Sequence, residues 1–490
     1  MTTFRSPDEA TDPGESRLER LQRGVVGLLV SYQEYDADRP WMKRYPATRF
    51  AQAAVVDGPY LLTTAQMVAG ATMIEAEREG RPPRARVRVV HQDPELNLTL
   101  LAVDEPGFFD GLRPLELATS TPTGGTVETV RWRAQQFEVA ATRVKRMVVG
   151  EVYFGRLRHA FLLGQTDLTE GGWAEPVVLG DRLIGISSGQ DEQTAWTVPC
   201  ELLGAYLAQA RDPSRYVGFA VVRFAWQSNM DRALAHWLGQ EGAQQGVVIR
   251  AIPRGSTGDG VLHSRDILLS LDGHPIDSAG YYRHPRFGRI EFTNIVIDGH
   301  RVGDVVPATV LRQGVEVELS LTLRGYTNGT DLIPLRRGNE PPPYAIVGGL
   351  VFVELDGDYL RTWGNEWWNR APTRLVSAFY LEEGGQRPDR RRIIVLSHVL
   401  PSAITLGYHD CRDLPVHTID GQPVDSIADV VAAFDAVTGP FVRVEFFANE
   451  VRREVVLDAT TLADATRRIL EDFGIPAGHR LAERAVPSLD

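Results

Sequence analysis

The segment Asp93-Pro94-Glu95-Leu96-Asn97-Leu98-Thr99-Leu100-Leu101-Ala102-Val103 places a polar turn directly before an apolar run of strand length. Runs of the same kind occur at 24–30 and 53–56, and turn residues separate them. Short runs at regular spacing indicate antiparallel β-structure rather than helices. The 46 Gly and 30 Pro, spread along the chain, favour the same interpretation. We therefore predict that 23–210 is mainly β and that a helix at 199–210 closes it.

Composition bounds the class of protein to which this chain can belong. Its 490 residues suggest about three or four domains, and 43% hydrophobic with 24% charged residues is typical of globular chains. A net charge of −12 argues against a nucleic-acid partner, and the basic run at 387–392 is expected to be a solvated loop. Cys200 and Cys411 fall in different predicted domains, so no disulfide framework is expected.

The amino-terminal residues 1–19 are polar, so we expect them to be disordered and to form neither a signal peptide nor a membrane span. No other stretch approaches the roughly 18 apolar residues that a transmembrane helix needs. A cytoplasmic location without a membrane partner is therefore predicted. A periplasmic location is the alternative if a leader has been trimmed.

The carboxyl-terminal half contains an internal repeat. Leu271-Asp272-Gly273-His274-Pro275-Ile276 and Ile419-Asp420-Gly421-Gln422-Pro423-Val424 each place an Asp-Gly turn between apolar residues, as in a tight hairpin. An alternating apolar segment ends each copy, at 315–323 and at 441–447. A polar, proline-rich stretch at 336–343 lies between the copies and is predicted to be a linker.

Motifs in this half resemble the PDZ domains of the Deg/HtrA protease family. Tyr216-Val217-Gly218-Phe219 is similar to the family's Tyr-Leu-Gly-Ile carboxylate-binding loop, and 265–273 is similar to its Gly-Asp-Ile-Ile-Leu-Ser-Phe-Asp-Gly segment. The second unit opens at 344–352 and resembles the larger second PDZ domain of the plant organellar Deg branch. The resemblance implies peptide binding by Tyr216, Val217, Gly218 and Phe219, with Gly349, Leu350 and Val351 as weaker candidates.

The amino-terminal half resembles the trypsin-like domain of the same family, but the catalytic positions differ. Leu62-Thr63-Thr64-Ala65-Gln66-Met67-Val68 matches the family's Leu-Thr-Asn-Ala-His-Val-Val, with Gln66 at the histidine. The segment 93–103 matches Asp-Pro-Glu-Leu-Asp-Leu-Ala-Leu-Leu-Lys-Val, with Asn97 at the catalytic carboxylate. Glutamine cannot accept a proton near neutral pH. An amide in place of the carboxylate costs a working triad on the order of 10⁴ in turnover.

The segment 165–178 occupies the place of the family's nucleophile loop, Gly-Asn-Ser-Gly-Gly-Pro, but it contains no serine. Alignment on Pro176 puts Trp173 at the serine position, whereas alignment on Gln165-Thr166-Asp167 puts Glu175 there. Neither side chain can act as the nucleophile. Both assignments stay open, and the degenerate triad is Gln66 and Asn97 with either of these two residues.

The expected fold is mainly β, with a trypsin-like double β-barrel followed by two PDZ domains of α+β type. The predicted boundaries are 1–19 for the disordered amino terminus, 20–210 for the degenerate protease domain, 215–327 for the first PDZ domain and 340–485 for the extended second one. The resemblance implies a homo-oligomer, either a trimer or a multiple of one.

The predicted function is that of a catalytically inactive pseudoprotease that binds peptides or protein carboxyl termini through its first PDZ domain. Two alternatives stay open. One is an active serine endopeptidase of protein quality control, and the other is a structural subunit of a mixed oligomer with active paralogues. No cofactor or metal is expected, because the spacing of His398, His409, His417 and Cys411 matches no tetrahedral zinc pattern.

Overall fold

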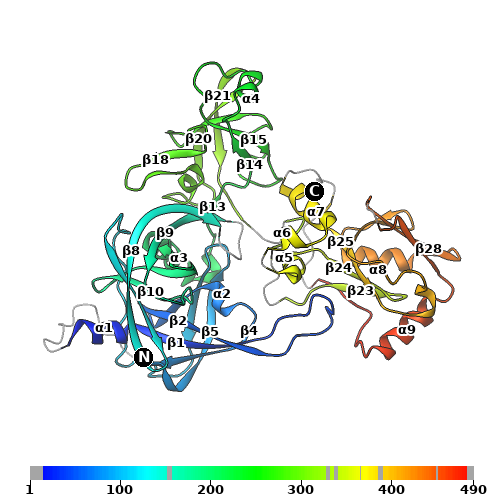
Figure 1. Ribbon diagram of the computed structural model, residues 1–490, viewed down its shortest axis with the longest axis horizontal. Helices are drawn as coiled ribbons and strands as arrows, with labels where there is room; N and C mark the ends of the chain where they lie inside the picture. Colours follow the sequence, from blue (N-terminus) through cyan, green and yellow to red (C-terminus); the bar gives the residue numbers. More distant parts are fainter. Residues whose placement is uncertain are drawn as a thin grey trace. The chain divides into compact units, whose positions relative to one another are not determined.

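The computed structural model divides the chain into two compact units, Met1–Tyr32 with Pro46–Tyr326 and Gln33–Tyr45 with Thr327–Asp490. Figure 1 labels many of the helices and strands of both units. The fold is mainly β, as the sequence predicted. The structure describes residues 15–151, 157–326, 331–335, 340–364, 366–383, 390–448 and 451–482.

The first unit begins with two closed β-barrels, which confirms the predicted double β-barrel. The strand order is β1-β2-β3-β6-β5-β4 in the first barrel and β10-β11-β12-β9-β8-β7 in the second. The strands of the first barrel are β1 Val25–Tyr32, β2 Ala47–Val56, β3 Tyr60–Thr63, β4 Ala71–Arg78, β5 Arg81–Asp93 and β6 Leu98–Val103. Those of the second are β7 Thr126–Arg133, β8 Gln136–Glu151, β9 Arg158–Thr166, β10 Pro176–Leu179, β11 Arg182–Asp191 and β12 Thr194–Pro199.

Strand β6 occupies the apolar run after the Asp-Pro turn and is buried along nearly its whole length. It pairs with β3 and β5, and the helices α2 (Ala65–Val68) and α3 (Cys200–Ala210) lie near it. The hydroxyl of Tyr206 on α3 accepts the N–H of Leu100 at 3.1 Å and so fixes this helix to the first barrel. The helix predicted at 199–210 is therefore confirmed, one residue shorter at its start.

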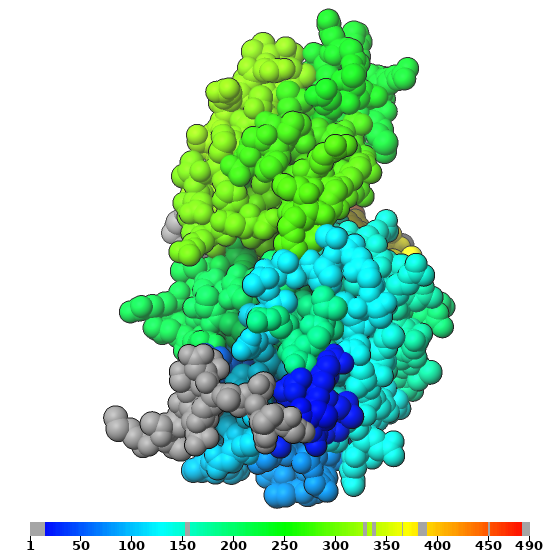
Figure 2. Space-filling model, turned by 90° about the vertical axis from the view of Figure 1, so that its left-hand side faces the viewer, coloured from blue at the N-terminus to red at the C-terminus, as the bar shows by residue number. Residues whose placement is uncertain are grey.

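Helix α1 (Arg17–Arg23) corrects the expectation that 1–19 are disordered. Its first turn is held by a capping box, in which the Ser16 hydroxyl accepts the Glu19 N–H and the Glu19 carboxylate accepts the Ser16 N–H. Its arginines pair with acidic residues of the second barrel, and Figure 2 shows the dark blue residues of this segment beside cyan residues. Residues 1–14 lie outside the described residues.

The remainder of the first unit folds around a sheet of order β14-β15-β16-β20-β21. The predicted hairpin is present, since Asp272 and Gly273 have φ of 49° and 72°, as a tight two-residue turn with two left-handed residues requires. The elements are η1 Pro213–Arg215, β13 Ala220–Val221, β14 Ala225–Ser228, α4 Arg232–Trp237, β15 Val247–Ala251, β16 Ile267–Leu271, β17 His274–Pro275, β18 Tyr281–His284, β19 Gly288–Glu291, η2 Phe292–Val296, β20 Val305–Arg312, β21 Val315–Thr322 and β22 Arg324–Gly325.

The second unit is built on a sheet of order β29-β28-β26-β25-β24-β23-β30. Asp420 and Gly421 form the second predicted hairpin turn, with φ of 48° and 78°. The strands are β23 Tyr344–Val347, β24 Leu350–Glu354, β25 Ile394–Val399, β26 Leu414–Ile419, β27 Gln422–Pro423, β28 Phe441–Phe446, β29 Glu454–Asp458 and β30 His479–Arg480. The helices are α5 Gly357–Leu360, η4 Arg361–Trp363, α6 Trp367–Arg370, α7 Thr373–Glu383, η5 Ala403–Thr405, α8 Ile427–Asp435 and α9 Leu462–Asp472.

The segment Gln33–Tyr45 belongs to this second unit, although the sequence had assigned it to the protease domain at 20–210. The ring of Trp41 packs edge-on against that of Tyr344, with centroids 6.0 Å apart. The guanidinium of Arg480 donates to the carbonyl of Pro40 at 3.0 Å. Aromatic and charge-assisted contacts between residues far apart in sequence explain why no local pattern indicated this placement.

The expectation that the basic run at 387–392 is a solvated loop is wrong for the residues that the structure describes. Arg390 and Arg392 are buried, and their guanidinium groups donate to backbone carbonyls. Arg391 pairs with Asp425 at 2.6 Å. Buried arginine is stable where its donors are satisfied in this way.

Candidate functional site

Asn97, in the turn directly before β6, lies next to Gln66 at the start of α2. Asn97 is almost fully buried, and its Oδ1 accepts the backbone N–H of Gln66 at 2.8 Å. Its Nδ2 donates to the hydroxyl of Ser188 at 2.9 Å. Its φ of 57° is left-handed, a conformation that asparagine adopts more readily than most residues.

The side-chain amides of Gln66 and Asn97 are polar but do not titrate. A side-chain amide donates and accepts hydrogen bonds but takes up no proton near neutral pH. The arrangement of Gln66, Asn97 and Ser188 can therefore hold the backbone in place, but it cannot perform general-base chemistry.

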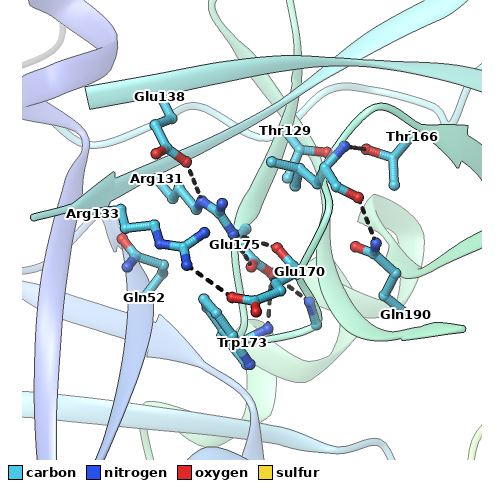
Figure 3. A network of polar contacts seen from close by, with 12 residues as sticks. Gln52, Thr129, Arg131, Arg133, Glu138, Thr166, Glu170, Trp173, Glu175 and Gln190 are labelled. Atoms are coloured by element: carbon cyan, nitrogen blue, oxygen red, sulfur yellow. Dashed lines mark hydrogen bonds and ion pairs between the residues drawn. The ribbon is translucent and has the colours of Figure 1, made fainter. Parts of the chain in front are cut away.

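The loop that precedes β10 folds back on itself at Glu175. Oε2 of this carboxylate accepts the N–H of Gly172 at 3.1 Å and that of Trp173 at 2.9 Å (Figure 3). Gly172 and Ala174 have φ of 90° and 66°, so left-handed residues flank Trp173 on both sides. Trp173 is half-buried and lies beneath the guanidinium of Arg131, 5.4 Å from its ring centroid.

Glu175 is fully buried, and Arg131 is its nearest positive charge. Arg131 Nη1 lies 3.6 Å from Glu175 Oε1, and both side chains are at most 3% exposed. Burial raises the pKa of the Glu175 carboxyl, while Arg131 and the loop N–H groups oppose that rise. Arg131 also donates to the Glu138 carboxylate at 2.7 Å and to the carbonyl of Glu170 at 2.5 Å, as Figure 3 shows.

Gln52 connects this loop to both barrels. Its backbone N–H donates to the carbonyl of Trp173 at 2.8 Å. Its side-chain amide bonds both the N–H and the carbonyl of Trp132 on β7, each at 2.9 Å. A long polar side chain on β2 thus bridges from the first barrel to the second beside the loop.

The loop 216–219, which follows α3 and η1, is anchored on the first barrel. The hydroxyl of Tyr216 donates to the carboxyl of Asp93, and its ring packs against that of His91, tilted by 34° with centroids 3.8 Å apart. Burial raises the pKa of the buried Asp93, whereas the Tyr216 hydrogen bond lowers it. Burial and the Asp93 charge raise the pKa of Tyr216, so the phenol stays a donor.

The remaining residues of that loop differ in exposure. Val217 is 59% exposed, and its N–H donates to Oε1 of Gln209 at 3.2 Å. Gly218 has a φ of 76°, and Phe219 is buried. The loop leads into β13, which pairs with β22, and the next strand, β14, is an edge strand that pairs with β15 in the described part of its sheet.

The corresponding residues of the second unit have a different environment. Gly349, Leu350 and Val351 are buried at the start of β24. This strand pairs with β23 along one edge and with β25 along the other. In the described residues, β24 therefore has no unpaired edge to which a peptide strand could add.

Three residues near these sites carry roles that no sequence motif indicates. Ser188 and Gln52 supply side-chain hydrogen bonds, and Arg131 lies beside Glu175. Their positions on β11, β2 and β7 are brought together only by barrel closure, so no local spacing indicates them. Among the described residues no group of three or more His, Cys, Asp or Glu side chains could hold a metal ion.

Comparisons with known proteins find one domain family and relatives that extend over nearly the whole chain. The PDZ domain family matches residues 333–480. Protease Do-like 2, chloroplastic, of Arabidopsis thaliana is 24% identical over 496 residues, which cover 99% of this chain and 79% of that protein. Putative protease Do-like 3, mitochondrial, of the same plant is 23% identical over 471 residues, which cover 94% and 80%. A solved structure of the HtrA-type protease AlgW with decapeptide covers 64% of this chain and all of that chain, with a TM-score of 0.48 and 18% identity.

The two barrels and the PDZ match define a trypsin-like protease homologue with a PDZ domain. The chain is a homologue in the Deg/HtrA family, and its similarity to the plant Do-like proteases extends over nearly its whole length. No helix in the described residues is long and apolar enough to cross a membrane.

Proposed function

We propose that this chain is a catalytically inactive Deg/HtrA-like pseudoprotease that serves as a peptide-binding scaffold. The observation that carries the proposal is the amide of Asn97, which bonds the Gln66 N–H and the Ser188 hydroxyl. In a working triad a carboxylate holds a histidine, and that histidine takes the proton of the nucleophile. Here the positions assigned to the carboxylate and the base hold two neutral amides.

The loop before β10 supports the same proposal. Neither Trp173 nor Glu175 carries the hydroxyl that a serine protease uses as its nucleophile, and Glu175 is bonded to its own loop. The alternative of an active serine endopeptidase would require a nucleophile and a base from other residues. Casein hydrolysis tests this directly: we expect no turnover above a blank, and a rate that follows the concentration of the chain would refute the proposal.

We assign peptide binding to the first PDZ domain, at 215–327, rather than to the second, at 340–485. The edge strand β14 can accept an added strand, whereas β24 is paired along both edges. The backbone N–H groups of Gly218 and Phe219 are those we assign to the terminal carboxylate, since the Val217 N–H bonds Gln209.

Fluorescence anisotropy with the full chain tests this assignment. A library of labelled peptides with free carboxyl termini is compared with the same peptides amidated at that terminus. We expect binding of free termini that weakens at least about tenfold on amidation, because the charge-assisted hydrogen bonds are lost. Equal affinity for both forms would remove the carboxylate-binding role of this loop.

The family resemblance supports a homo-oligomer, and a mixed oligomer with active paralogues is the alternative structural role. Sedimentation of the pure chain separates them, because self-association requires no second protein. A monomer that assembles only with a paralogue would favour the subunit role. A cytoplasmic location stays a prediction, and the plant relatives carry mitochondrial and chloroplastic names.

A further inference from the structure

The loop before β10 contains a small anion-binding site that the chain itself fills. The N–H groups of Gly172 and Trp173 converge on one oxygen of the Glu175 carboxylate, at 3.1 and 2.9 Å. Successive backbone N–H groups directed at one point form a nest that binds anions. Here the anion is a buried side chain two and three residues further along, as Figure 3 shows.

The position of this nest matters for protease chemistry. In a trypsin-like enzyme the oxyanion of the intermediate is bound by the N–H of the nucleophile and by the N–H two residues before it. If Trp173 stands at the nucleophile position, its own N–H is one of these donors. If Glu175 stands there, the residue two positions before it is again Trp173. The Trp173 N–H is thus an oxyanion donor in both alignments.

The surroundings hold the carboxylate in this place. Arg131 lies 3.6 Å from its second oxygen and is itself fixed by its bond to Glu138. Gly172 packs closely against β11, since a Cβ there would lie 2.8 Å from Cα of Gly189. The carboxylate therefore has a positive charge on one side and a tightly packed turn on the other.

We propose that the carboxylate of Glu175 is an internal occupant of the former oxyanion site and keeps this loop closed to an external anion. The proposal rests on the proposed function and adds a second loss to that of the triad. Gln66 and Asn97 remove general-base catalysis. Glu175 removes the electrostatic stabilisation of an oxyanion, because its carboxylate occupies the Trp173 N–H. Restoring the triad alone then leaves the site unable to bind an oxyanion.

Amide hydrogen exchange of the full chain, followed by mass spectrometry of peptides from the loop, tests the occupation. The variants are Glu175→Ala and Glu175→Gln. Glu170→Gln is the matched control, because its carboxylate lies in the same loop but pairs with Arg133 at the surface. We expect exchange at Gly172 and Trp173 to rise at least about tenfold in Glu175→Ala and not in the control.

Glu175→Gln preserves the volume and one acceptor, so its loop is expected to exchange at a rate between those of the parent and Glu175→Ala. If Glu175→Ala does not fold, the exchange rate of Glu175→Gln decides whether the carboxylate protects the loop N–H groups. Loop exchange in Glu175→Gln no faster than in Glu170→Gln would overturn the proposal.

Back-substitution gives a second readout. Gln66→His, Asn97→Asp and Trp173→Ser are introduced together, with and without Glu175→Gly, the residue that the family motif has there when aligned on Pro176. We expect Glu175→Gly to raise the rate of fluorophosphonate labelling at the new serine at least about tenfold. Equal rates in both backgrounds, including no labelling in either, would overturn the proposal. Labelling of the unaltered chain would instead refute the proposed function, and the exchange comparison would still decide the role of Glu175.

Discussion

Replacement of Asn97 tests whether this residue has kept the structural hydrogen bonds of a catalytic carboxylate after losing its charge. Asn97→Ala removes the acceptor of the Gln66 N–H and the donor to Ser188 in a position that is 1% exposed. It also leaves alanine at a φ of 57°.

The expected cost follows from these contacts. Each lost hydrogen bond contributes about 1 kcal/mol, and leaving a buried N–H without an acceptor adds about 1 kcal/mol more. The left-handed backbone costs alanine about 1 kcal/mol relative to glycine or asparagine, which both adopt this conformation readily. Asn97→Ala should therefore lower the free energy of unfolding by about 4 kcal/mol and Asn97→Gly by about 3 kcal/mol. Asn97→Asp keeps an acceptor for each neighbour and should lose the least.

Urea unfolding followed by tryptophan fluorescence measures these differences on the transition of the first unit. Glu192 supplies the control for the backbone term, because it is exposed with a φ of 50°. Glu192→Gly should be about 1 kcal/mol more stable than Glu192→Ala. Should Asn97→Ala unfold within about 0.5 kcal/mol of the parent, the structural role of this amide would be refuted.

Three further predictions concern the same unit. Burial lowers the pKa of His159 to about 4, so the parent should lose about 3 kcal/mol of stability as the pH falls from 6.5 to 4. The stability of His159→Leu, measured by urea unfolding at each pH, should not show this loss, and parallel pH profiles of the two proteins would contradict the prediction. Tyr216→Phe leaves the buried Asp93 carboxyl without its phenol donor and should cost about 2 kcal/mol in urea unfolding, whereas no change would argue against this anchor. Gln52→Ala should cost about 2 kcal/mol, and the control Phe50→Ala, exposed on the same strand, should change little; equal effects would exclude a bridging role.

Local sequence signals predicted much of the fold. The run 98–103 became β6 because an uninterrupted apolar segment fits a strand buried on both faces. Both Asp-Gly hairpins formed because the two residues accept the left-handed conformations that the tight turn requires. The spacing of Ser16 and Glu19 also fits a capping box, but the polar composition of the segment led to a prediction of disorder rather than of a helix.

The candidate site could be predicted only in part. Gln66 and Asn97 lie in motifs close enough to the family's wording for their positions to be inferred, and the structure brings them together. The direction of the Glu175 side chain could not be inferred, because a buried carboxylate must be oriented toward hydrogen-bond donors, and the sequence does not show where these lie. Those donors include Arg131, which only barrel closure brings to the loop.

The most direct test of the account is the reaction of the unaltered chain with an active-site-directed fluorophosphonate, followed by mass spectrometry. A chain with Gln66 and Asn97 in place of base and carboxylate has no activated hydroxyl, so we predict no adduct under conditions that label an active Deg/HtrA protease to completion. Stoichiometric labelling of one residue in the double β-barrel would contradict the account.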